Sequence, residues 1–326
     1  MKAVHPASED DGILSANIPP EMAGERLDKI LARLFPEFSR MSLTQWIREG
    51  HVQVDGATWR PRDKARGGEQ VRLRVVREEK TGCAAQDIPL DIVHEDEALL
   101  VIDKPAGLVV HPGAGNPQDT MMNALLHHAP ELAELPRAGI VHRLDKDTSG
   151  LLVVARSLQA RKHLEEQIAT RTFEREYHAL VNGVMTSGGT IDAPIGRHPH
   201  QRTRMAVREG GRAAVSHYRV MERLRVHTLV KVMLETGRTH QIRVHMAHIR
   251  HPLVGDPVYG GRLRLPPDCG TALRDILQGF RRQALHAARL AVTHPLSGER
   301  LSWESPWPAD MLVLLEALRE DAAGHG

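Results

Sequence analysis

Apolar residues recur with helical spacing in two short segments near the start of the chain, 26–35 and 41–49. Pro36 ends the first segment, Ser39 precedes the second as a candidate N-terminal cap, and Gly50 follows its end. We therefore predict two consecutive helices, each with one apolar face.

An alternating pattern of apolar and polar residues follows the second helix. Residues 52–54 lead into Asp55-Gly56, a pair that favours a tight hairpin, and residues 71–75 alternate in the same way. Two helices and a small β element predict one compact α/β module. Its expected bounds are 21–76, with a flexible polar tail at 1–20 and a charged linker at 77–87.

Strand patterns dominate residues 88–326, and they do not alternate with helices as parallel βαβ units would. This pattern predicts an α+β domain with a mixed, mainly antiparallel sheet and flanking helices. The expected strands cover 98–102, 151–155, 177–181, 213–220 and 226–234. The expected helices cover 157–170 after a Ser157 cap, 241–249 after a Thr239 cap, and 309–318.

The composition is that of an ordinary globular protein, with 326 residues of which 41% are hydrophobic and 26% charged. No apolar stretch reaches the roughly 20 residues that cross a bilayer. The first residues include Glu9, Asp10 and Asp11 and no apolar signal segment. Two cysteines, Cys83 and Cys269, make no disulfide framework. We therefore expect a cytoplasmic protein with no membrane partner.

The net charge of +2 conceals two basic blocks. Residues 24–74 hold 11 Lys and Arg against 7 Asp and Glu, and residues 197–250 hold 12 against 3. Two basic surfaces favour a polyanion such as nucleic acid, although two solvated faces with no partner would carry the same charge. Aromatic residues are only 3% of the chain, so a surface of aromatic rings that stacks bases is not expected.

Two polar clusters lie between the apolar segments, at residues 142–150 and 236–245. The first is a tight loop that leads into a buried strand, and loops on a rigid sheet are where catalytic groups concentrate. The alternative for this loop is a purely structural turn in which Asp145 or Asp147 binds the local backbone.

The second cluster raises the question of a metal site, because His240, His245 and His248 are candidate zinc ligands. The glutamate of an H-E-x-x-H site is missing and neither cysteine is near in sequence, so we expect no metal. The glycine-rich loops of nucleotide-binding proteins and the G-x-S-x-G elbow of esterases are also missing from the sequence.

The first module resembles an S4 RNA-binding domain, because RLDKIL, Ser39-Arg40 and IREGHVQVDG follow one another in the expected order. The resemblance implies that the second helix and the turn after it face RNA. It assigns contacts with phosphate to Arg40, Arg48 and Lys64. The alternative is a helical cap that only stabilises its neighbour.

Four ordered motifs cover the rest of the chain. They are DKPAGL at 103–108, HRLDKDTSG at 142–150, REYHALV at 175–181 and TGRTHQIRVH at 236–245. Together they resemble the RNA pseudouridine synthases of the RluA type, and the resemblance covers nearly the whole chain after residue 20.

The resemblance implies an isomerase that breaks the uracil N1–C1′ bond, rotates the flipped-out base and rejoins it through C5. It makes Asp145 the catalytic aspartate, Tyr177 the residue that stacks on uracil, and Arg243 the cation that supports the aspartate. Tyr177 is also a candidate for transferring a proton. The implied substrate-binding residues are Arg143, Arg238 and His240.

The segment HIRHPLVGDPVYGG at 248–261 most resembles the branch of the family that modifies uridines in the helix 69 loop of large-subunit (23S) ribosomal RNA. The expected partner is therefore this RNA, free or in a pre-ribosomal particle. The reaction has no redox step and loses no group, so neither a cofactor nor a metal is expected. Two alternatives remain: the same chemistry on other rRNA or tRNA uridines, and a non-catalytic RNA-binding ribosome-assembly factor.

Overall fold

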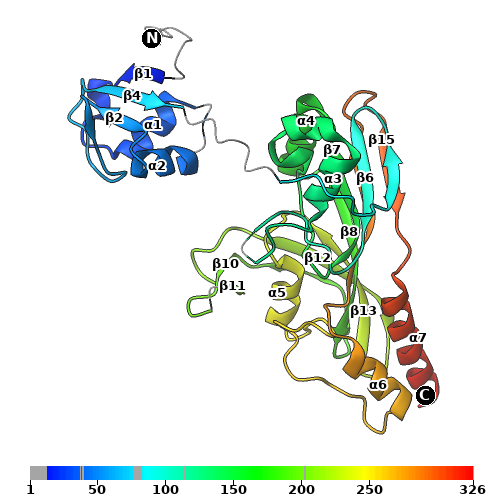
Figure 1. Cartoon of the computed structure of the whole chain (residues 1–326). Helices are drawn as coiled ribbons and strands as arrows, with labels where there is room; N and C mark the ends of the chain where they lie inside the picture. Colours follow the sequence, from blue (N-terminus) through cyan, green and yellow to red (C-terminus); the bar gives the residue numbers. More distant parts are fainter. Residues whose placement is uncertain are drawn as a thin grey trace. The chain divides into compact units, whose positions relative to one another are not determined.

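The chain divides into two compact units, residues 1–82 and 83–326, which are described separately below (Figure 1). The computed structural model describes residues 13–36, 38, 40–75, 83–113, 115–201 and 203–325, without the side chains of residues 40–42. The expected cap Ser39 and most of the expected linker lie outside these described residues.

The small unit packs two helices against one antiparallel sheet. As predicted, helix α1 (Leu27–Leu34) and helix α2 (Arg40–Arg48) follow one another. The sheet has the order β1-β4-β2-β3, and its strands are Ile13–Asn17, Gln70–Arg74, Val52–Val54 and Ala57–Thr58 in that order. Apolar residues of both helices and of the sheet form one core, among them Leu27, Ile30, Leu31, Leu43, Trp46, Ile47, Val52, Val54, Val71 and Leu73.

The predicted hairpin is confirmed, and the predicted tail is partly wrong. Asp55 and Gly56 have φ of 49° and 78°, the positive values that a tight turn between β2 and β3 requires. Residues 13–17, expected in the tail, form strand β1 and pair with β4 along their whole length. The cause is tertiary: β4 has an edge that binds a further strand, and Ile18 beyond β1 is buried in the core.

The large unit is built on one nine-stranded sheet with the order β5-β6-β7-β14-β8-β13-β12-β9, to which β15 is added beside β14. Strands β7 and β14 are parallel, and the other neighbouring pairs of this sheet are antiparallel among the described residues. The predicted α+β class with a mainly antiparallel sheet is therefore confirmed. The strand bounds are Ile92–Glu95 (β5), Leu99–Lys104 (β6), Ser149–Ala155 (β7), Glu174–Asn182 (β8), Gly189–Asp192 (β9), Val215–Arg223 (β12), His227–Leu234 (β13), Leu285–Thr293 (β14) and Arg300–Glu304 (β15).

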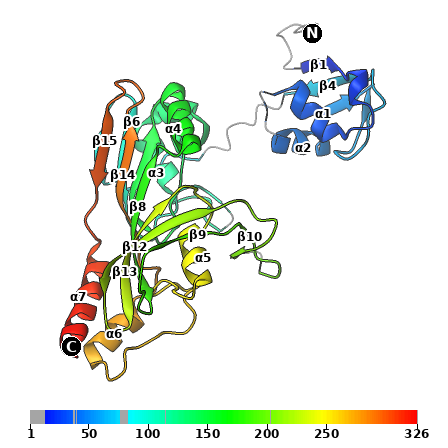
Figure 2. The same cartoon turned by 180° about the vertical axis from the view of Figure 1, so that it is seen from behind.

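Helices cover both faces of this sheet, and Figure 2 shows their arrangement from behind. Helices α3 (Met121–His128) and α5 (Gln241–His248) share a core with one face of β6, β7, β8 and β13. Helix α4 (Leu158–Thr170) packs on the opposite face of β6 and β7, and α6 (Thr271–Gly279) and α7 (Ala309–Ala323) pack near β8 and β13. A separate hairpin, β10 (Ile195–Arg197) and β11 (Met205–Val207), packs against α5.

The strands and helices that were predicted in the large unit exist, and several further elements were not predicted. Helix α4 begins after Ser157, whose hydroxyl accepts a hydrogen bond from the Ala160 backbone N–H as a cap does. The elements that were not predicted are the helices α3 and α6 and the strands β5, β9, β10, β11, β14 and β15. Strand β14 has the sequence LHAARLAVT, and its alanines have a low preference for strands, so its place in the sheet depends on its neighbours.

Candidate active site

The loop at residues 142–150 leads into the buried strand β7, as the sequence predicts. Leu144 is 3% exposed and packs in the core, and the Thr148 N–H donates to the Asp145 backbone carbonyl to close a turn. Gly150 has φ of 110°, and a Cβ at this position would lie 2.3 Å from the Ala287 carbonyl oxygen of β14. Only glycine therefore fits where the loop joins the sheet.

Lys104 holds this loop in place by hydrogen bonds to backbone carbonyls. The side chain is fully buried, and its ammonium donates to the carbonyls of Pro105, Leu108 and Lys146 at 2.7, 2.9 and 3.0 Å. Burial lowers the Lys104 pKa to about 7, and the nearby carboxylates of Asp147 and Asp145 oppose that change. The ammonium thus ties the DKPAG turn to the residue that follows Asp145.

Three side chains at or near the start of β14 hold the second half of the loop. Gln283 donates to the Thr148 hydroxyl at 3.0 Å, and His286 lies 3.0 Å from the Ser149 hydroxyl. Arg282 donates to the Asp147 carbonyl at 3.2 Å. The same guanidinium forms two hydrogen bonds of 2.6 and 2.8 Å with the carboxylate of Asp310 in α7, which fixes its direction.

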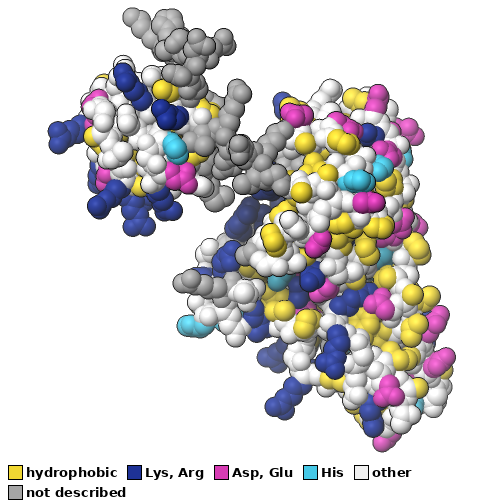
Figure 3. Space-filling view, in the orientation of Figure 1, with side chains coloured by type: hydrophobic (Ala, Val, Ile, Leu, Met, Phe, Trp, Pro, Cys, Tyr) yellow, Lys and Arg dark blue, Asp and Glu magenta, His cyan; other side chains and the backbone are white. Residues whose placement is uncertain are grey.

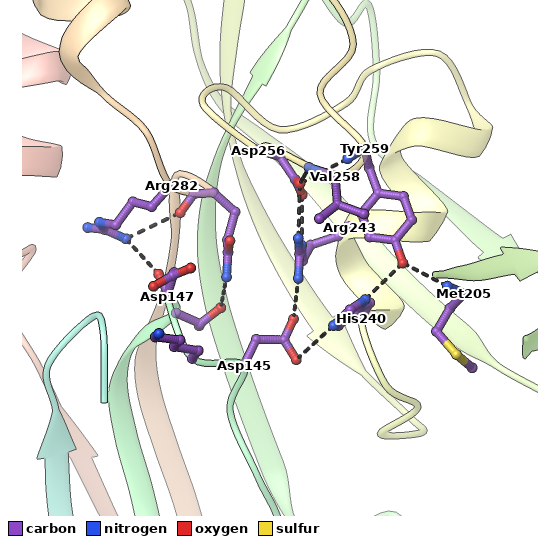
Figure 4. A network of polar contacts seen from close by, with 12 residues as sticks. Asp145, Asp147, Met205, His240, Arg243, Asp256, Val258, Tyr259 and Arg282 are labelled. Atoms are coloured by element: carbon purple, nitrogen blue, oxygen red, sulfur yellow. Dashed lines mark hydrogen bonds and ion pairs between the residues drawn. The ribbon is translucent and has the colours of Figure 1, made fainter. Parts of the chain in front are cut away.

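The Asp145 carboxylate forms an ion pair with Arg243 of helix α5, as Figure 4 shows. Arg243 Nη1 donates to Asp145 Oδ2 at 3.0 Å, while its Nε and Nη2 donate to the two oxygens of Asp256 at 2.7 and 3.0 Å. The Asp256 side chain is fully buried, that of Arg243 is 6% exposed, and that of Asp145 is 15% exposed. The two carboxylates raise the Arg243 pKa further above its ordinary value, so its charge is permanent.

This geometry differs from that of an aspartate that only closes a turn. The Asp145 carboxylate binds the side chain of Arg243, 98 positions away in the chain. An aspartate that only closes a turn needs no such partner. The charged group of Asp145 is thus held on the open side of the loop by a fixed cation.

His240 lies on the other side of Asp145. Its Nε2 is 3.9 Å from Asp145 Oδ1, and its Nδ1 is 2.8 Å from the hydroxyl of Tyr259. The backbone of His240 is left-handed, with φ of 57°, which is strained for a residue other than glycine. Burial lowers the His240 pKa below its ordinary value, and the charge of Asp145 opposes this change.

The expected Thr239 cap on helix α5 is wrong, because His240 occupies the N-cap position and its side chain does not cap the helix. The turn before α5 is ordered instead by Gln241. The Oε1 atom of its side chain accepts hydrogen bonds from the Thr236 hydroxyl at 2.8 Å and from the Arg238 backbone N–H at 3.0 Å. Its amide group donates to the Val215 carbonyl at 3.0 Å, so Gln241 joins this turn to β12.

Tyr177 lies on the same face of β8 as Arg175 and is 5% exposed. Burial raises the Tyr177 pKa above its ordinary value, the charge of Arg175 opposes this rise, and the charge of Asp145 adds to it. Arg175 is itself 7% exposed, and its Nε has no hydrogen-bond partner among the described residues. A neutral phenol thus lies within electrostatic range of Asp145, and the buried Arg175 guanidinium interacts with that phenol.

The other predicted substrate-binding residues lie in different settings. Arg143 is exposed beside Asp145. Arg238 donates from Nε to the Ala213 carbonyl at 3.0 Å, and its described polar contacts do not include Asp145. The structure therefore brings Asp145, Arg243 and His240 into direct proximity and leaves Arg238 bound to the backbone just before β12.

The predicted RNA-binding residues of the small unit also differ from one another. Arg48 is exposed at the end of α2, and the side chain of Arg40 lies outside the described residues. Lys64 is exposed beside an open hollow that is also lined by carboxylates, which weaken attraction for phosphate. Figure 3 shows that Lys and Arg side chains gather at one end of the small unit and, on the large unit, near β10, β11 and α5.

The three histidines weighed as zinc ligands do not form one site. His245 is fully buried, and its two ring nitrogens lie 2.9 Å from the Ser216 hydroxyl and 3.0 Å from the Ala193 carbonyl. No group of three or more His, Cys, Asp or Glu side chains that could hold a metal occurs among the described residues. Within the same residues, no helix is both long and apolar enough to span a membrane.

Asp256 and Tyr259 complete the network around Asp145, and neither was predicted from the sequence. Both lie in the GDPVYGG segment, which was used above only to compare the chain with one branch of the family. One signal was available: Asp256 is the only acidic residue from 236 to 267, within a strongly basic stretch. An isolated carboxylate in such a stretch is a candidate partner for a buried arginine.

Comparison with known proteins agrees with the fold. Residues 98–248 match the family model described as RNA pseudouridylate synthase, and residues 25–71 match the S4 domain. The chain is 57% identical over 314 residues to the ribosomal large subunit pseudouridine synthase D of Xanthomonas campestris pv. campestris. This match covers 96% of this chain and 95% of that protein. It is 59% identical over 307 residues to the protein of the same name from Pseudomonas aeruginosa, covering 94% and 96%.

A solved structure supports the same assignment. The human protein RNA Pseudouridylate Synthase Domain Containing 4 superposes with a TM-score of 0.55 at 28% sequence identity, covering 70% of this chain and 92% of that one. The chain therefore belongs to the RNA pseudouridine synthase family and carries an N-terminal S4 domain. It is an RNA pseudouridine synthase, and the relatives that it resembles at 57% and 59% identity are ribosomal large subunit pseudouridine synthases D.

Proposed function

We propose that this enzyme converts uridines of large-subunit ribosomal RNA to pseudouridine, with Asp145 as the catalytic residue. The observation that carries the proposal is the Asp145 carboxylate, partly open to solvent and held at 3.0 Å by the buried Arg243. The names of the relatives with 57% and 59% identity support the choice of RNA. A ribosomal substrate places the enzyme in the cytoplasm.

The reaction needs a group that assists cleavage of the bond between uracil N1 and ribose C1′. A carboxylate can add to C1′, stabilise positive charge that develops there, or accept the C2′ proton. Arg243 orients Asp145 for each of these routes, and Asp256 orients Arg243 from the side away from the substrate. The base then rotates within the site and rejoins the ribose through C5, so no atom leaves.

Tyr177 serves in this proposal as a stacking surface for the uracil ring. Its raised pKa keeps the phenol protonated at neutral pH, which disfavours a role as general base. An aromatic ring beside a flipped base stabilises it by stacking, which compensates part of the cost of unstacking it from the RNA.

Arg143 serves to fill the space that the uridine leaves in the RNA. It is exposed, it lies two positions before Asp145 in the same loop, and its charge suits a site surrounded by phosphates. Flipping a nucleotide costs a few kcal/mol, so a side chain that occupies the vacated stack raises the population of the flipped state. Arg40, Arg48 and Lys64 of the S4 domain are proposed to bind phosphates of the RNA backbone.

We propose the loop of helix 69 as the target, in free rRNA or in a pre-ribosomal particle. The test uses purified protein with a helix 69 transcript and, in parallel, other 23S fragments and tRNA transcripts. Pseudouridine is mapped after chemical labelling, with and without a metal chelator. The expected result is conversion in the helix 69 loop that is unaffected by chelator and is lost in Asp145→Asn.

The possible outcomes separate the alternatives. Conversion confined to another rRNA fragment or to tRNA would assign the same chemistry to a different substrate. RNA binding without conversion of any transcript would contradict the proposed reaction. Mapping of rRNA from cells that lack the protein checks the result in the cell, because the pseudouridines made by this enzyme disappear there.

A further inference from the structure

Tyr259 lies at the junction between the active site and the β10–β11 hairpin (Figure 4). Its hydroxyl oxygen accepts the backbone N–H of Met205, the first residue of β11, at 2.9 Å, and lies 2.8 Å from His240 Nδ1. Its ring lies 5.0 Å from the guanidinium carbon of Arg243 and 5.2 Å from that of Arg204. The residue therefore contacts both groups that flank Asp145 and also a hairpin outside the site.

The two hydrogen bonds of the Tyr259 hydroxyl set the direction of its own proton. A backbone N–H can only donate, so the Met205 N–H occupies a lone pair of the Tyr259 oxygen. The remaining hydroxyl proton has His240 Nδ1 as its acceptor among the described residues. Nδ1 then carries a lone pair, and in a neutral imidazole the ring proton is on Nε2.

The opposite side of the ring agrees with this assignment. His240 Nε2 faces Asp145 Oδ1 at 3.9 Å, and an ionised carboxylate accepts hydrogen bonds but cannot donate them. A lone pair on Nε2 would be repelled by this carboxylate, whereas an N–H is attracted to it. The distance is longer than a hydrogen bond, so the N–H is available for an acceptor between His240 and Asp145.

We propose that Tyr259 is a positioning residue that, through the chain Met205 N–H, Tyr259 O–H and His240, fixes His240 in the tautomer that presents Nε2–H to Asp145 and to the uridine beside it. The strained left-handed backbone of His240 aims the ring in this direction, and the hydroxyl decides which nitrogen carries the proton. The consequence for catalysis rests on the proposed role of Asp145, but the tautomer itself does not.

The same residue connects the site to the basic hairpin. Arg204 stacks on the Tyr259 ring and donates to the carbonyl of Val258, while Met205 binds the Tyr259 hydroxyl. Asp256 Oδ1 accepts the N–H groups of Val258 and Tyr259 at 2.8 and 2.9 Å, so the carboxylate that orients Arg243 also holds the backbone of Tyr259. A displacement of the hairpin would therefore change the hydrogen bond between Tyr259 and His240.

The first experiment measures the tautomer without any RNA. The full-length protein is labelled with ¹⁵N-histidine, and His240 is identified among the 20 histidines as the signal that is lost in His240→Asn. Asparagine suits this position because it tolerates a left-handed backbone. At neutral pH, wild type is expected to show a proton on Nε2 and none on Nδ1, and Tyr259→Phe is expected to show a mixture of tautomers. A proton on Nδ1 in wild type, or an unchanged pattern in Tyr259→Phe, would overturn the proposal.

The second experiment measures the single-turnover rate on RNA that the wild type modifies. Tyr259→Phe keeps the ring between the two arginines and removes the hydroxyl, so the rate is expected to fall about tenfold with little change in RNA affinity. In the His240→Asn background the same substitution is expected to cost nothing more, because the group that the hydroxyl positions is gone.

Tyr218→Phe is the matched control, since Tyr218 lies on β12 outside this network, and it is expected to keep the wild-type rate and tautomer. Equal rate losses from Tyr259→Phe in both backgrounds would mean that Tyr259 does not act through His240. If no RNA is modified at all, the proposed function fails while the tautomer experiment still decides the role of Tyr259.

Discussion

Selected basic side chains of the two units lie in different settings. In the S4 domain Arg48 and Lys64 are exposed, whereas in the catalytic unit Lys104, Arg243 and Arg282 are buried or nearly so and bind fixed partners. An exposed cation attracts a polyanion at any nearby phosphate, and salt screens this attraction. A buried cation holds one loop or carboxylate in one geometry. The comparison thus separates residues that we propose to bind RNA from residues that hold the loop and the carboxylates of the candidate site in place.

The largest expected effect comes from Asp145→Asn, which keeps the size and shape of the side chain and removes its negative charge. We expect the single-turnover rate to fall by at least about a thousandfold while RNA affinity is retained. Asp147→Asn, two positions further in the same loop, is the matched control and is expected to change the rate only slightly. Asp145→Asn that turns over faster than about a thousandth of wild type would contradict the assignment.

The next largest effect is expected from Arg243→Lys. Lysine keeps the positive charge but cannot bind Asp256 through two parallel hydrogen bonds and Asp145 through a third. We expect the rate to fall about a hundredfold, as for a catalytic group displaced by about 1 Å. RNA affinity, measured by filter binding, should stay near the wild-type value. A large loss of affinity with an unchanged rate would place Arg243 on the RNA backbone instead.

The variant Arg243→Ala is less informative about catalysis, because it leaves the Asp256 carboxylate buried without its partner. Breaking a buried ion pair in this way costs about 3–5 kcal/mol of folding stability. We therefore expect Arg243→Ala to lower the urea midpoint markedly as well as the rate. Comparing the urea midpoints of the two variants distinguishes loss of the fold from loss of catalytic geometry.

Burial of Lys104 makes the free energy of unfolding depend on pH. Its pKa is about 7 in the folded protein against an ordinary value of 10.5, so between these values the unfolded chain binds more protons than the folded one. Its contribution to the free energy of unfolding therefore rises with pH over this window, by up to about 1.4 kcal/mol per pH unit, and is constant below pH 7.

Lys104→Met removes this contribution, so the difference in unfolding free energy between wild type and Lys104→Met should grow from pH 7 to pH 10. Urea unfolding at each pH measures the difference. Lys162→Met, on the surface of α4, serves as the control and should show no such trend. A constant difference across this range would mean that Lys104 keeps its proton in the folded state.

A smaller effect is expected when the S4 domain is removed by deleting residues 1–82. The catalytic unit has its own core, so its single-turnover rate at saturating RNA should change little. If Arg40, Arg48 and Lys64 each contact a phosphate, the slope of log affinity against log salt should become shallower by about 2–3. A fall in the saturating rate with an unchanged salt slope would support the alternative of a stabilising cap.

The smallest effects are expected from single substitutions in this domain. Arg48→Ala should lower the salt slope by about 0.7–0.9, as for one lost phosphate contact. Lys64→Ala should have a weaker effect, because carboxylates line the hollow beside Lys64. Arg33→Ala is the control, since Arg33 already binds Glu25 at 2.9 Å. Equal salt slopes in all three variants would show that Arg48 and Lys64 do not touch RNA.

Local signals in the sequence predicted the elements that depend on neighbouring residues. The Asp55-Gly56 turn and the Ser157 cap each involve contacts over a few positions, and both are present as predicted. The loop that holds Asp145 was also predicted, because its glycine and small polar residues favour a tight turn before an apolar strand. These features need no knowledge of distant parts of the chain.

The contacts that define the site join residues far apart in the sequence, and only the tertiary structure decided them. Asp145 and Arg243 are 98 positions apart, and Ser149 and His286 are 137 apart. Strand β14, rich in alanine, has its place because β7 and β8 flank it, and His240 keeps its strained backbone because the surrounding structure holds it there. The sequence alone determined which side chains the loop and the helix carry. The packing of α5 and the 255–261 segment against the loop determined their partners, because a buried charge is stable only where the fold supplies an opposite charge at hydrogen-bonding distance.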